Sequence, residues 1–431
     1  MLHFHLVSLF PEFYDSPLST ALMAKAQAAD ILRFSRHDPR TFTTDVHRST
    51  DDRPYGGGPG MVMLAEPLAA CLRSIPRTGR MLVMAPGGRP FTQTLARELA
   101  QEEDITIICG RYEGLDARLA EVFPLEPVCV GDVVLNGGET ASMAVIEAVG
   151  RLVPGFMGKE ASGDDESFSH GLLEYPHYTR PEVWEGHAVP EVLRGGNHAA
   201  IARWRREESL RMTVRHRPDL LEDAPLTGED AAVLAETPCL RPGRNLFACL
   251  IHYPVLLGEK NSGASSLTNL DIHDIARTSR TYGLGGFYVA TPLDDQARML
   301  AGILRHWTAG PAARHNPDRA EALGIVRHVD VMENAIADIL ARTGLRPRVL
   351  ATSAQWPRKQ EAPSIPLVQV REWLRSGPVL LCFGTGHGLA PEALAQCDGQ
   401  LRPLRFSGGY NHLSVRAAAA ITLDRILGDF A

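Results

Sequence analysis

Short apolar segments that end in glycine-rich turns are the feature that most constrains the fold of this chain. Three such segments, residues 81–85, 105–109 and 128–135, are rich in aliphatic side chains, and each leads into a turn that contains two glycines. A helix-like segment, residues 93–101, lies between the first two. This alternation predicts an α/β domain with a mostly parallel sheet. Ligands bind at the carboxyl ends of such strands, so the glycine turns are candidate binding loops.

The same alternation occurs twice in the 431 residues, a length that exceeds what one hydrophobic core usually organises. We expect a first α/β domain at residues 1–158 and a second at residues 245–431. The polar, glycine-containing residues 159–172 predict a linker. The arginine-rich residues 173–240 that follow it have the pattern of a small helical domain.

Charge is unevenly distributed along the chain. The formal net charge is -7, which argues against a protein that coats nucleic acid. Residues 201–217, however, hold six arginines and two glutamates, a local excess of four positive charges. This stretch is a candidate phosphate-binding surface. A solvated helix face is the alternative, and charge alone does not separate the two.

Several classes of protein and site have no signature in the sequence. No run of 18 apolar residues is present and the N-terminal segment has no basic flank, so we expect a cytoplasmic protein without a membrane span. The seven cysteines form no C-x-x-C pair, and the histidines of the second half fit no ligand spacing, so no metal site is predicted. The glycine turns match neither the dinucleotide fingerprint nor the P-loop, which disfavours an NAD-dependent oxidoreductase.

Five longer motifs occur in a fixed order: DDRPYGGGPGM, CGRYEG, GDVVLNGGE, PHYTRPEVWEG and GNHAAIARWR. Through them, from about residue 2 to residue 238, the chain resembles the bacterial tRNA (guanine-N1)-methyltransferase family. The resemblance implies a SPOUT-class fold, in which an α/β domain with a trefoil knot is followed by a linker and a helical tRNA-binding domain. It also implies a homodimer that transfers a methyl group from S-adenosylmethionine to N1 of guanosine-37 in tRNA.

Matched position by position, the resemblance implies where the methyl donor and the tRNA bind. The donor-binding positions, in the glycine turns, are Met84, Ala85, Pro86, Gly110, Glu113, Gly114, Val130, Gly131, Asp132, Val133, Val134, Leu135, Gly137 and Gly138. The tRNA-binding positions are Asp51, Arg53, Tyr55, His177 and Arg180. Carboxylates, guanidinium groups and a phenol suit contacts to bases and phosphates.

The reaction needs a base, because N1 of guanine carries a proton at neutral pH and negative charge moves towards O6 as that proton leaves. The resemblance places the base at Glu166 and the charge-stabilising arginine at Arg151. The family has aspartate where this chain has Glu166, and Asp164 and Asp165 precede it, so the sequence leaves open which carboxylate acts. The resemblance also implies Mg²⁺. The alternative function is a tRNA-binding regulator that binds the donor without catalysis.

Residues 245–431 resemble a second family of SPOUT-class RNA methyltransferases through TNLDIHDIARTSRTYG, GFYVATP, FGTGHGL and YNHLSVRAA. This resemblance implies two SPOUT-type trefoil-knotted α/β domains in tandem, and a second RNA as the substrate of this half. Its candidate site positions are Arg277, Gly384, Gly386, Asn411 and Ser414. The alternative is a non-catalytic RNA-binding or dimerisation module.

Overall fold

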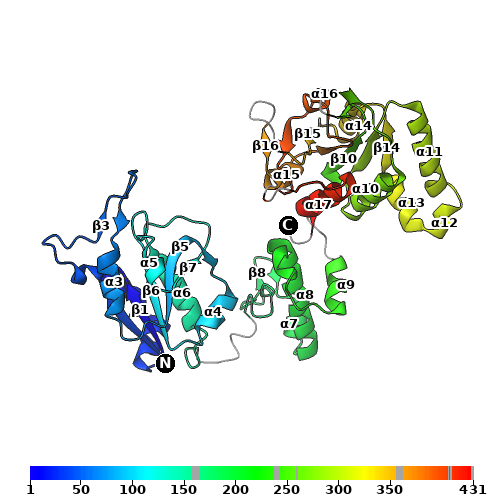
Figure 1. Ribbon diagram of the computed structural model, residues 1–431. Helices are drawn as coiled ribbons and strands as arrows, with labels where there is room; N and C mark the ends of the chain where they lie inside the picture. Colours follow the sequence, from blue (N-terminus) through cyan, green and yellow to red (C-terminus); the bar gives the residue numbers. More distant parts are fainter. Residues whose placement is uncertain are drawn as a thin grey trace. The chain divides into compact units, whose positions relative to one another are not determined.

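The protein is described by a computed structural model that covers residues 1–157, 166–236, 243–258, 261–355, 363–405, 407 and 410–428. The chain forms two compact units, Met1–Glu174 and Tyr175–Ala431. Each unit contains one large parallel β-sheet flanked by helices (Figure 1). The prediction of a mixed α/β fold with parallel sheets is therefore confirmed.

The sheet of the first unit has five parallel strands in the order β2-β1-β6-β5-β7. Its strands are β1 (Leu2–Val7), β2 (Leu32–His37), β5 (Arg80–Pro90), β6 (Asp104–Ile108) and β7 (Leu125–Cys129), and β3 (Asp51–Asp52) and β4 (Val62–Met63) form a separate hairpin. The helices are α1 (Asp15–Leu18), α2 (Ala21–Ala28), α3 (Ala65–Arg73), α4 (Gln93–Leu99), α5 (Leu119–Val122) and α6 (Gly138–Gly150).

Helices α6 and α3 belong to two separate apolar clusters on this sheet. Leu6 of β1 packs in one cluster with Val145 of α6, whereas the next residue, Val7, packs in the other with Leu72 of α3. Successive residues of a strand point to opposite faces, so the two helices cover opposite faces of the sheet. Each of these buried side chains contributes about 1.5–3 kcal/mol of stability. The carboxyl ends of the central strands are therefore held firmly from both sides.

The apolar segment 128–135 differs from its prediction as a strand. β7 ends at Cys129, and the residues after it form a turn in which Gly131 has a φ of +157°. The N–H of Val133 donates to the carbonyl of Gly131 at 2.8 Å. Val134 is 93% exposed. Val130 still packs against the core, but Val133, Val134 and Leu135 are exposed, so their apolar character requires another explanation.

The sheet of the second unit has seven parallel strands in the order β14-β13-β10-β17-β15-β18-β16. They are β10 (Leu246–Ile251), β13 (Gly286–Ala290), β14 (Val326–Val329), β15 (Arg348–Ala351), β16 (Ser364–Ile365), β17 (Val379–Gly384) and β18 (Gly399–Leu401), beside a small hairpin of β11 (Val255–Leu256) and β12 (Ser262–Gly263). Its helices are α10 (Asn269–Thr281), α11 (Asp294–Thr308), α12 (Ala312–His315), α13 (Pro317–Gly324), α14 (Met332–Thr343), α15 (Leu367–Leu374), α16 (Pro391–Leu394) and α17 (Val415–Leu427).

Every residue of β10 is buried, as expected for a central strand covered on both faces. Leu250 packs with Ile275 of α10, and Ile251 packs with Met332 of α14 in a different cluster. The described residues of this unit that precede the sheet form three α-helices and a small hairpin. They contain α7 (Glu191–Arg194), α8 (His198–His216), α9 (Gly228–Glu236) and a hairpin of β8 (Val183–Trp184) and β9 (His187–Ala188).

Candidate active site

The glycine turns that follow β6 and precede α6 lie against each other at the carboxyl end of the first sheet. The N–H of Gly138 donates to the carbonyl of Gly110 at 3.0 Å, and Gly137 forms an isolated β-bridge with Arg111. A Cβ on Gly138 would lie 2.7 Å from the Cα of Cys109, so only glycine permits this approach. Three of the predicted donor-binding positions are therefore neighbours.

The turn within β5 projects from the sheet beside these loops. Met84 and Arg89 both pair with Val128 of β7, so residues 85–88 leave the sheet as a bulge. This bulge holds the predicted donor-binding positions that follow Met84, and it borders a cavity of about 370 Å³. A bulge at the end of a strand presents backbone N–H and carbonyl groups to a ligand.

A second cavity, of about 420 Å³, lies between the turn after β6 and the end of the glycine-rich loop that precedes β4. It is lined by Phe10, Gly60, Met61, Arg111, Tyr112, Glu113, Leu135 and Asn136. The N–H of Glu113 donates to the carbonyl of Met61 at 3.0 Å, and the N–H of Met63 donates to the carbonyl of Gly114 at 2.9 Å. The loop predicted to bind tRNA and the turn predicted to bind the donor therefore share one cavity.

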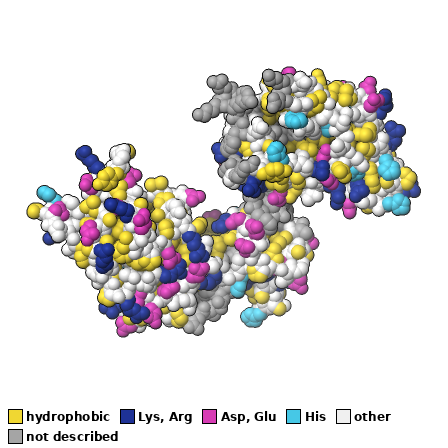
Figure 2. Space-filling model, viewed as in Figure 1, with side chains coloured by type: hydrophobic (Ala, Val, Ile, Leu, Met, Phe, Trp, Pro, Cys, Tyr) yellow, Lys and Arg dark blue, Asp and Glu magenta, His cyan; other side chains and the backbone are white. Residues whose placement is uncertain are grey.

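The predicted tRNA-binding positions occur in both units. Asp51 lies on β3, where it pairs with Met63, and Arg53 and Tyr55 lie on the loop that follows, with Tyr55 fully exposed. In the second unit, residues 177 and 180 are also exposed. Figure 2 shows basic and acidic side chains interspersed over the viewed face of the first unit. RNA binding there would depend on individual side chains and not on a broad positive field.

A buried ion pair, which the motifs did not single out, fixes the turn after β6. Glu139 is 1% exposed and accepts a hydrogen bond from Ser8 Oγ at 2.6 Å. Nε of Arg111 donates a hydrogen bond to Oε1 of Glu139 at 3.2 Å. Nη2 of Arg111 lies 2.8 Å from Oε2 and forms an ion pair with it, but the angle is not that of a hydrogen bond. The guanidinium also lies over the ring of Phe10, 4.4 Å from the ring centre. Arg111 therefore connects the cavity wall to the start of α6.

Arg151 and Glu166, the two predicted catalytic residues, form an ion pair. Arg151 is the residue at the carboxyl end of α6, and Glu166 is the first described residue after position 157. The side chains are 46% and 34% exposed, so both can reach a bound substrate. The alternative bases Asp164 and Asp165 lie outside the described residues. The structure thus places a proton acceptor beside a charged donor at the end of the helix that starts at the glycine turns.

In the helical part of the second unit, the segment around His177 packs on α8. The guanidinium of Arg205 lies 4.8 Å from the ring centre of Tyr175, and the rings of Tyr178 and Trp204 are 6.2 Å apart. Four of the six arginines of the arginine-rich stretch also pair with carboxylates of this part, namely Arg203, Arg206, Arg211 and Arg217. These pairs give the arginines a structural role whether or not they also contact phosphate.

Asp230 is the most buried carboxylate of these pairs, and its removal is expected to loosen α9. Both of its oxygens accept from Arg206, at 3.0 and 2.9 Å, and Oδ2 accepts from the N–H of Thr227 at 2.8 Å, completing a reciprocal cap with the Thr227 hydroxyl. We expect Asp230→Ala to destabilise the α8–α9 contact by about 2 kcal/mol. Hydrogen–deuterium exchange of α9 amides should rise accordingly, whereas Asp219→Ala, in an exposed pair with Arg217, should change it little.

The same carboxylate makes this helix pair sensitive to strong acid. The hydrogen bonds from Arg206, with those from Thr227, lower the pKa of Asp230 to about 2. A lowered pKa stabilises the fold above the ordinary value for aspartate, and that stabilisation is lost as pH falls from about 4 towards 2. The protection factors of the α9 amides, which correct for the pH dependence of the intrinsic exchange rate, should therefore fall over this range in the parent protein, and Asp230→Ala should abolish the change. An equal fall in the variant would contradict the assignment.

In the second sheet, the loop after β17 meets the chain that follows β10. The Thr385 hydroxyl donates to the carbonyl of Ile251 at 3.0 Å, and a Cβ on Gly386 would lie 2.9 Å from the carbonyl oxygen of Leu256. Asn411 donates to the carbonyl of Ala354, after β15, at 2.7 Å. Ser414 caps α17. Arg277 is exposed on α10, and no contact among the described residues brings it to these loops.

His252, at the end of β10, is expected to make the second α/β domain sensitive to acid. It is fully buried, with Nδ1 3.0 Å from Ser265 Oγ, and burial lowers its pKa to about 4. Below the ordinary histidine pKa of 6.5, this histidine binds a proton in the unfolded chain but stays neutral in the folded chain. The free energy of unfolding therefore falls as pH decreases from 6.5 to 4. The free energy of unfolding decreases by about 3 kcal/mol over this range. The melting temperature of His252→Gln should fall less steeply over this range than that of the parent protein or of His306→Gln, an exposed control.

Comparison with known proteins identifies the family to which the chain belongs. Residues 2–223 match the family model for tRNA (Guanine-1)-methyltransferase TrmD. The tRNA (guanine-N(1)-)-methyltransferase of Oleidesulfovibrio alaskensis is 61% identical over 428 residues, which cover 99% of this chain and 100% of the relative. That of Nitratidesulfovibrio vulgaris is 62% identical over 424 residues, 98% of this chain and 99% of the relative. The chain belongs to the tRNA (guanine-1)-methyltransferase family.

Membership of this family confirms that the chain is a methyltransferase. Residues 245–428 match a further family model, that of the SAM-dependent RNA methyltransferases. A family member of Geobacter metallireducens is 49% identical over 236 residues, which are 54% of this chain but 96% of the relative. The first half of the chain therefore corresponds to a nearly complete family member, and the second half is a second methyltransferase domain.

S-adenosylmethionine is the methyl donor of both families, and the loops of the first unit fit it. The donor is a sulfonium cation with an adenosine and an amino acid part. The turns offer backbone groups at the end of β5 and beside Gly110, and the exposed apolar side chains of Val133 and Val134 are available to cover its adenosine. The carboxylate of Glu113 lines the larger cavity, where it suits a positive charge. Val133, Val134 and Leu135 are the exposed apolar side chains of the turn after β7.

Among the described residues, by contrast, no group of three or more side chains forms a set of ligands that suits magnesium. The group there that has metal-ligand spacing consists of His3, His5 and Asp104. Mg²⁺ prefers oxygen ligands, so two imidazoles do not suit it. No step below depends on Mg²⁺. None of the helices in the described part of the chain has the length and apolar character of a membrane span.

Proposed function

We propose that the first half of the chain transfers a methyl group from S-adenosylmethionine to N1 of guanosine-37 in tRNA. The observation that carries this proposal is the ion pair between Arg151 and Glu166, because a carboxylate and a guanidinium are the kinds of group that methylation of guanine N1 requires. The family resemblance supports a trefoil-knotted SPOUT fold, a helical tRNA-binding domain, a homodimer and a cytoplasmic location. These remain parts of the proposal.

The chemistry assigns one task to each of the two residues. S-adenosylmethionine supplies an electrophilic methyl group, whose bond to sulfur breaks with both electrons going to sulfur. Glu166 accepts the N1 proton of guanine, so that the N1 electron pair can form the new bond to carbon. Arg151 donates hydrogen bonds to O6, where negative charge gathers as the proton leaves. Arg111 and Glu139 act indirectly, because they hold the turn that lines the cavity.

For the second half we propose methyl transfer to another RNA, at the loops after β10, β15 and β17. The match to SAM-dependent RNA methyltransferases and the convergence of these loops support it. A non-catalytic module would keep the fold and lose donor turnover. The positions Gly384, Gly386, Asn411 and Ser414 are the ones to test. Arg277 is exposed on α10, the helix whose Asp271 and Asp274 pair with Arg416 near the start of α17.

The purified full-length protein should be incubated with labelled S-adenosylmethionine and unmodified tRNA transcripts that carry guanosine or adenosine at position 37, and the methylated nucleoside mapped. We expect N1-methylguanosine that requires guanosine-37. Donor binding without a product on any tRNA would instead favour the regulator. Labelling of ribosomal or other RNA that survives Arg151→Ala and disappears in Asn411→Ala would assign separate catalysis to the second half.

A further inference from the structure

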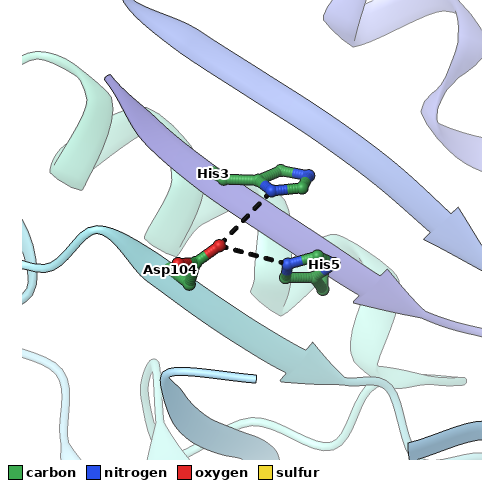
Figure 3. A group of neighbouring side chains, drawn as sticks. All are labelled: His3, His5 and Asp104. Atoms are coloured by element: carbon green, nitrogen blue, oxygen red, sulfur yellow. Dashed lines mark hydrogen bonds and ion pairs between the residues drawn. The ribbon is translucent and has the colours of Figure 1, made fainter. Parts of the chain in front are cut away.

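A group of two histidines and one aspartate lies on the first sheet, apart from the loops described above. His3 and His5 are on β1, and Asp104 begins β6, where it pairs in register with His3. Residues two apart on a strand point to the same face, so the three side chains share one face of the sheet. Figure 3 shows both imidazoles directed at the carboxylate of Asp104. The group lies towards the amino ends of these strands, whereas the glycine turns follow their carboxyl ends.

The distances within this group are long for direct hydrogen bonds and suit neighbouring ligands of one ion. Nδ1 of His3 and Nε2 of His5 each lie 3.4 Å from Oδ1 of Asp104, the second as a long hydrogen bond, and the three ligand atoms all lie within 4.8 Å of one another. A good N–H···O hydrogen bond is shorter, about 2.7–3.2 Å. Ligand atoms held about 2.0–2.1 Å from a tetrahedral zinc ion lie about 3.3–3.4 Å apart. The two histidine–aspartate distances match that spacing.

The ring nitrogen of each histidine that does not face Asp104 also has a partner, as the second nitrogen of a metal-bound histidine must. Nε2 of His3 lies 2.8 Å from Oγ of Ser35, and Nδ1 of His5 lies 3.1 Å from Nε2 of His37. These contacts orient the rings so that the other nitrogen of each faces Asp104.

The group is largely buried and lies near positively charged side chains. The side chains of His5, Asp104 and His3 are 6%, 12% and 16% exposed, so the group is sheltered yet still accessible to water. Arg77 opposes a cation, but its Nε lies 3.5 Å from Oδ2 and leaves Oδ1 to the histidines. Arg77 is also 71% exposed and bonded to Glu103, so its charge is partly neutralised and screened.

We propose that His3, His5 and Asp104 bind one Zn²⁺ ion, with water completing a tetrahedral site. Two imidazoles and one carboxylate are ligands that zinc accepts and that magnesium and calcium do not favour. The ion would connect β1 to β6, two central strands of the first sheet. It would stabilise the unit without taking part in methyl transfer.

The test uses the full-length protein after treatment with a chelator, titrated with ZnCl₂ by calorimetry and with CoCl₂ by absorption spectroscopy. We expect one ion per chain at this site, a four-coordinate cobalt spectrum without thiolate bands, and a higher melting temperature with zinc. His3→Gln and Asp104→Asn should each weaken zinc binding at least about tenfold. His315→Gln, which removes an exposed histidine elsewhere, should not.

Two results would overturn the site. One is a folded parent protein that binds no stoichiometric zinc. The other is zinc affinity that is unchanged in His3→Gln and in Asp104→Asn, with thiolate bands in the cobalt spectrum, which would place the ion at cysteines instead. Circular dichroism of each variant is recorded first. If Asp104→Asn does not fold, His3→Gln alone decides, because His3 is the most exposed of the three side chains.

Discussion

The Glu166→Ala variant should lose most of its methyl transfer activity while remaining folded. Loss of a general base typically lowers the rate by about 10²- to 10⁴-fold, and we expect kcat to fall within this range with little change in the KM for tRNA. The ion pair with Arg151 is half exposed, and such pairs contribute about 0–1 kcal/mol, so the variant should melt close to the parent protein. Activity on guanosine-37 tRNA and thermal unfolding are the two measurements.

Glu166→Asp is the matched control, because it restores the residue that the family has at this position and keeps the carboxylate. It should retain most of the activity, whereas Glu166→Gln should resemble the alanine variant. Activity of Glu166→Ala within about tenfold of the parent would contradict the assignment, since it is less than a general base contributes. Asp164→Asn and Asp165→Asn would then identify which neighbouring carboxylate takes the proton.

A central strand of the first sheet could be predicted because its pattern is local. The continuous apolar segment that predicts a strand at 105–109 matches β6 within one residue at each end. A parallel strand covered on both faces needs apolar side chains at most positions, so the sequence alone identifies it. The same rule failed for residues 128–135, because Val133, Val134 and Leu135 are exposed. Composition alone does not separate a strand from an apolar binding loop.

The candidate catalytic residues were predicted from family resemblance and not from physical pattern. An acidic linker is ordinarily solvated, and nothing in the spacing of Glu166 and Arg151 indicates chemistry by itself. Contacts between distant parts of the chain were missed for a related reason. Glu139 meets Ser8, and Asp104 meets His3, only because parallel strands bring residues about one hundred or more positions apart to the same place. No motif or ligand spacing can show such a group before the sheet order is known.

Replacing Arg111 with methionine is expected to destabilise the first unit more than any surface change. Its partner Glu139 is almost fully buried, and removing one partner of a buried pair leaves an uncompensated charge that costs about 3–5 kcal/mol. The Ser8 hydroxyl still donates a hydrogen bond to Glu139 in the variant, so we expect the destabilisation to lie near the lower end of this range. The turn at 110–114 also loses its contacts with Phe10 and with the Asn136 carbonyl. We therefore expect weaker S-adenosylmethionine binding as well as a lower melting temperature.

A double-variant cycle separates the buried charge from the position of the turn. Arg111→Met combined with Glu139→Gln removes both charges at similar volume, so it should recover much of the stability lost in Arg111→Met alone. Donor affinity should not recover with it, because the guanidinium that holds the turn is still missing. Calorimetric unfolding and binding titration of the four proteins measure both quantities. If Arg111→Met melts at the same temperature as the parent protein, the stability of the unit does not depend on the ion pair between Arg111 and Glu139. The turn must then be held by its backbone hydrogen bonds with Met61 and Met63.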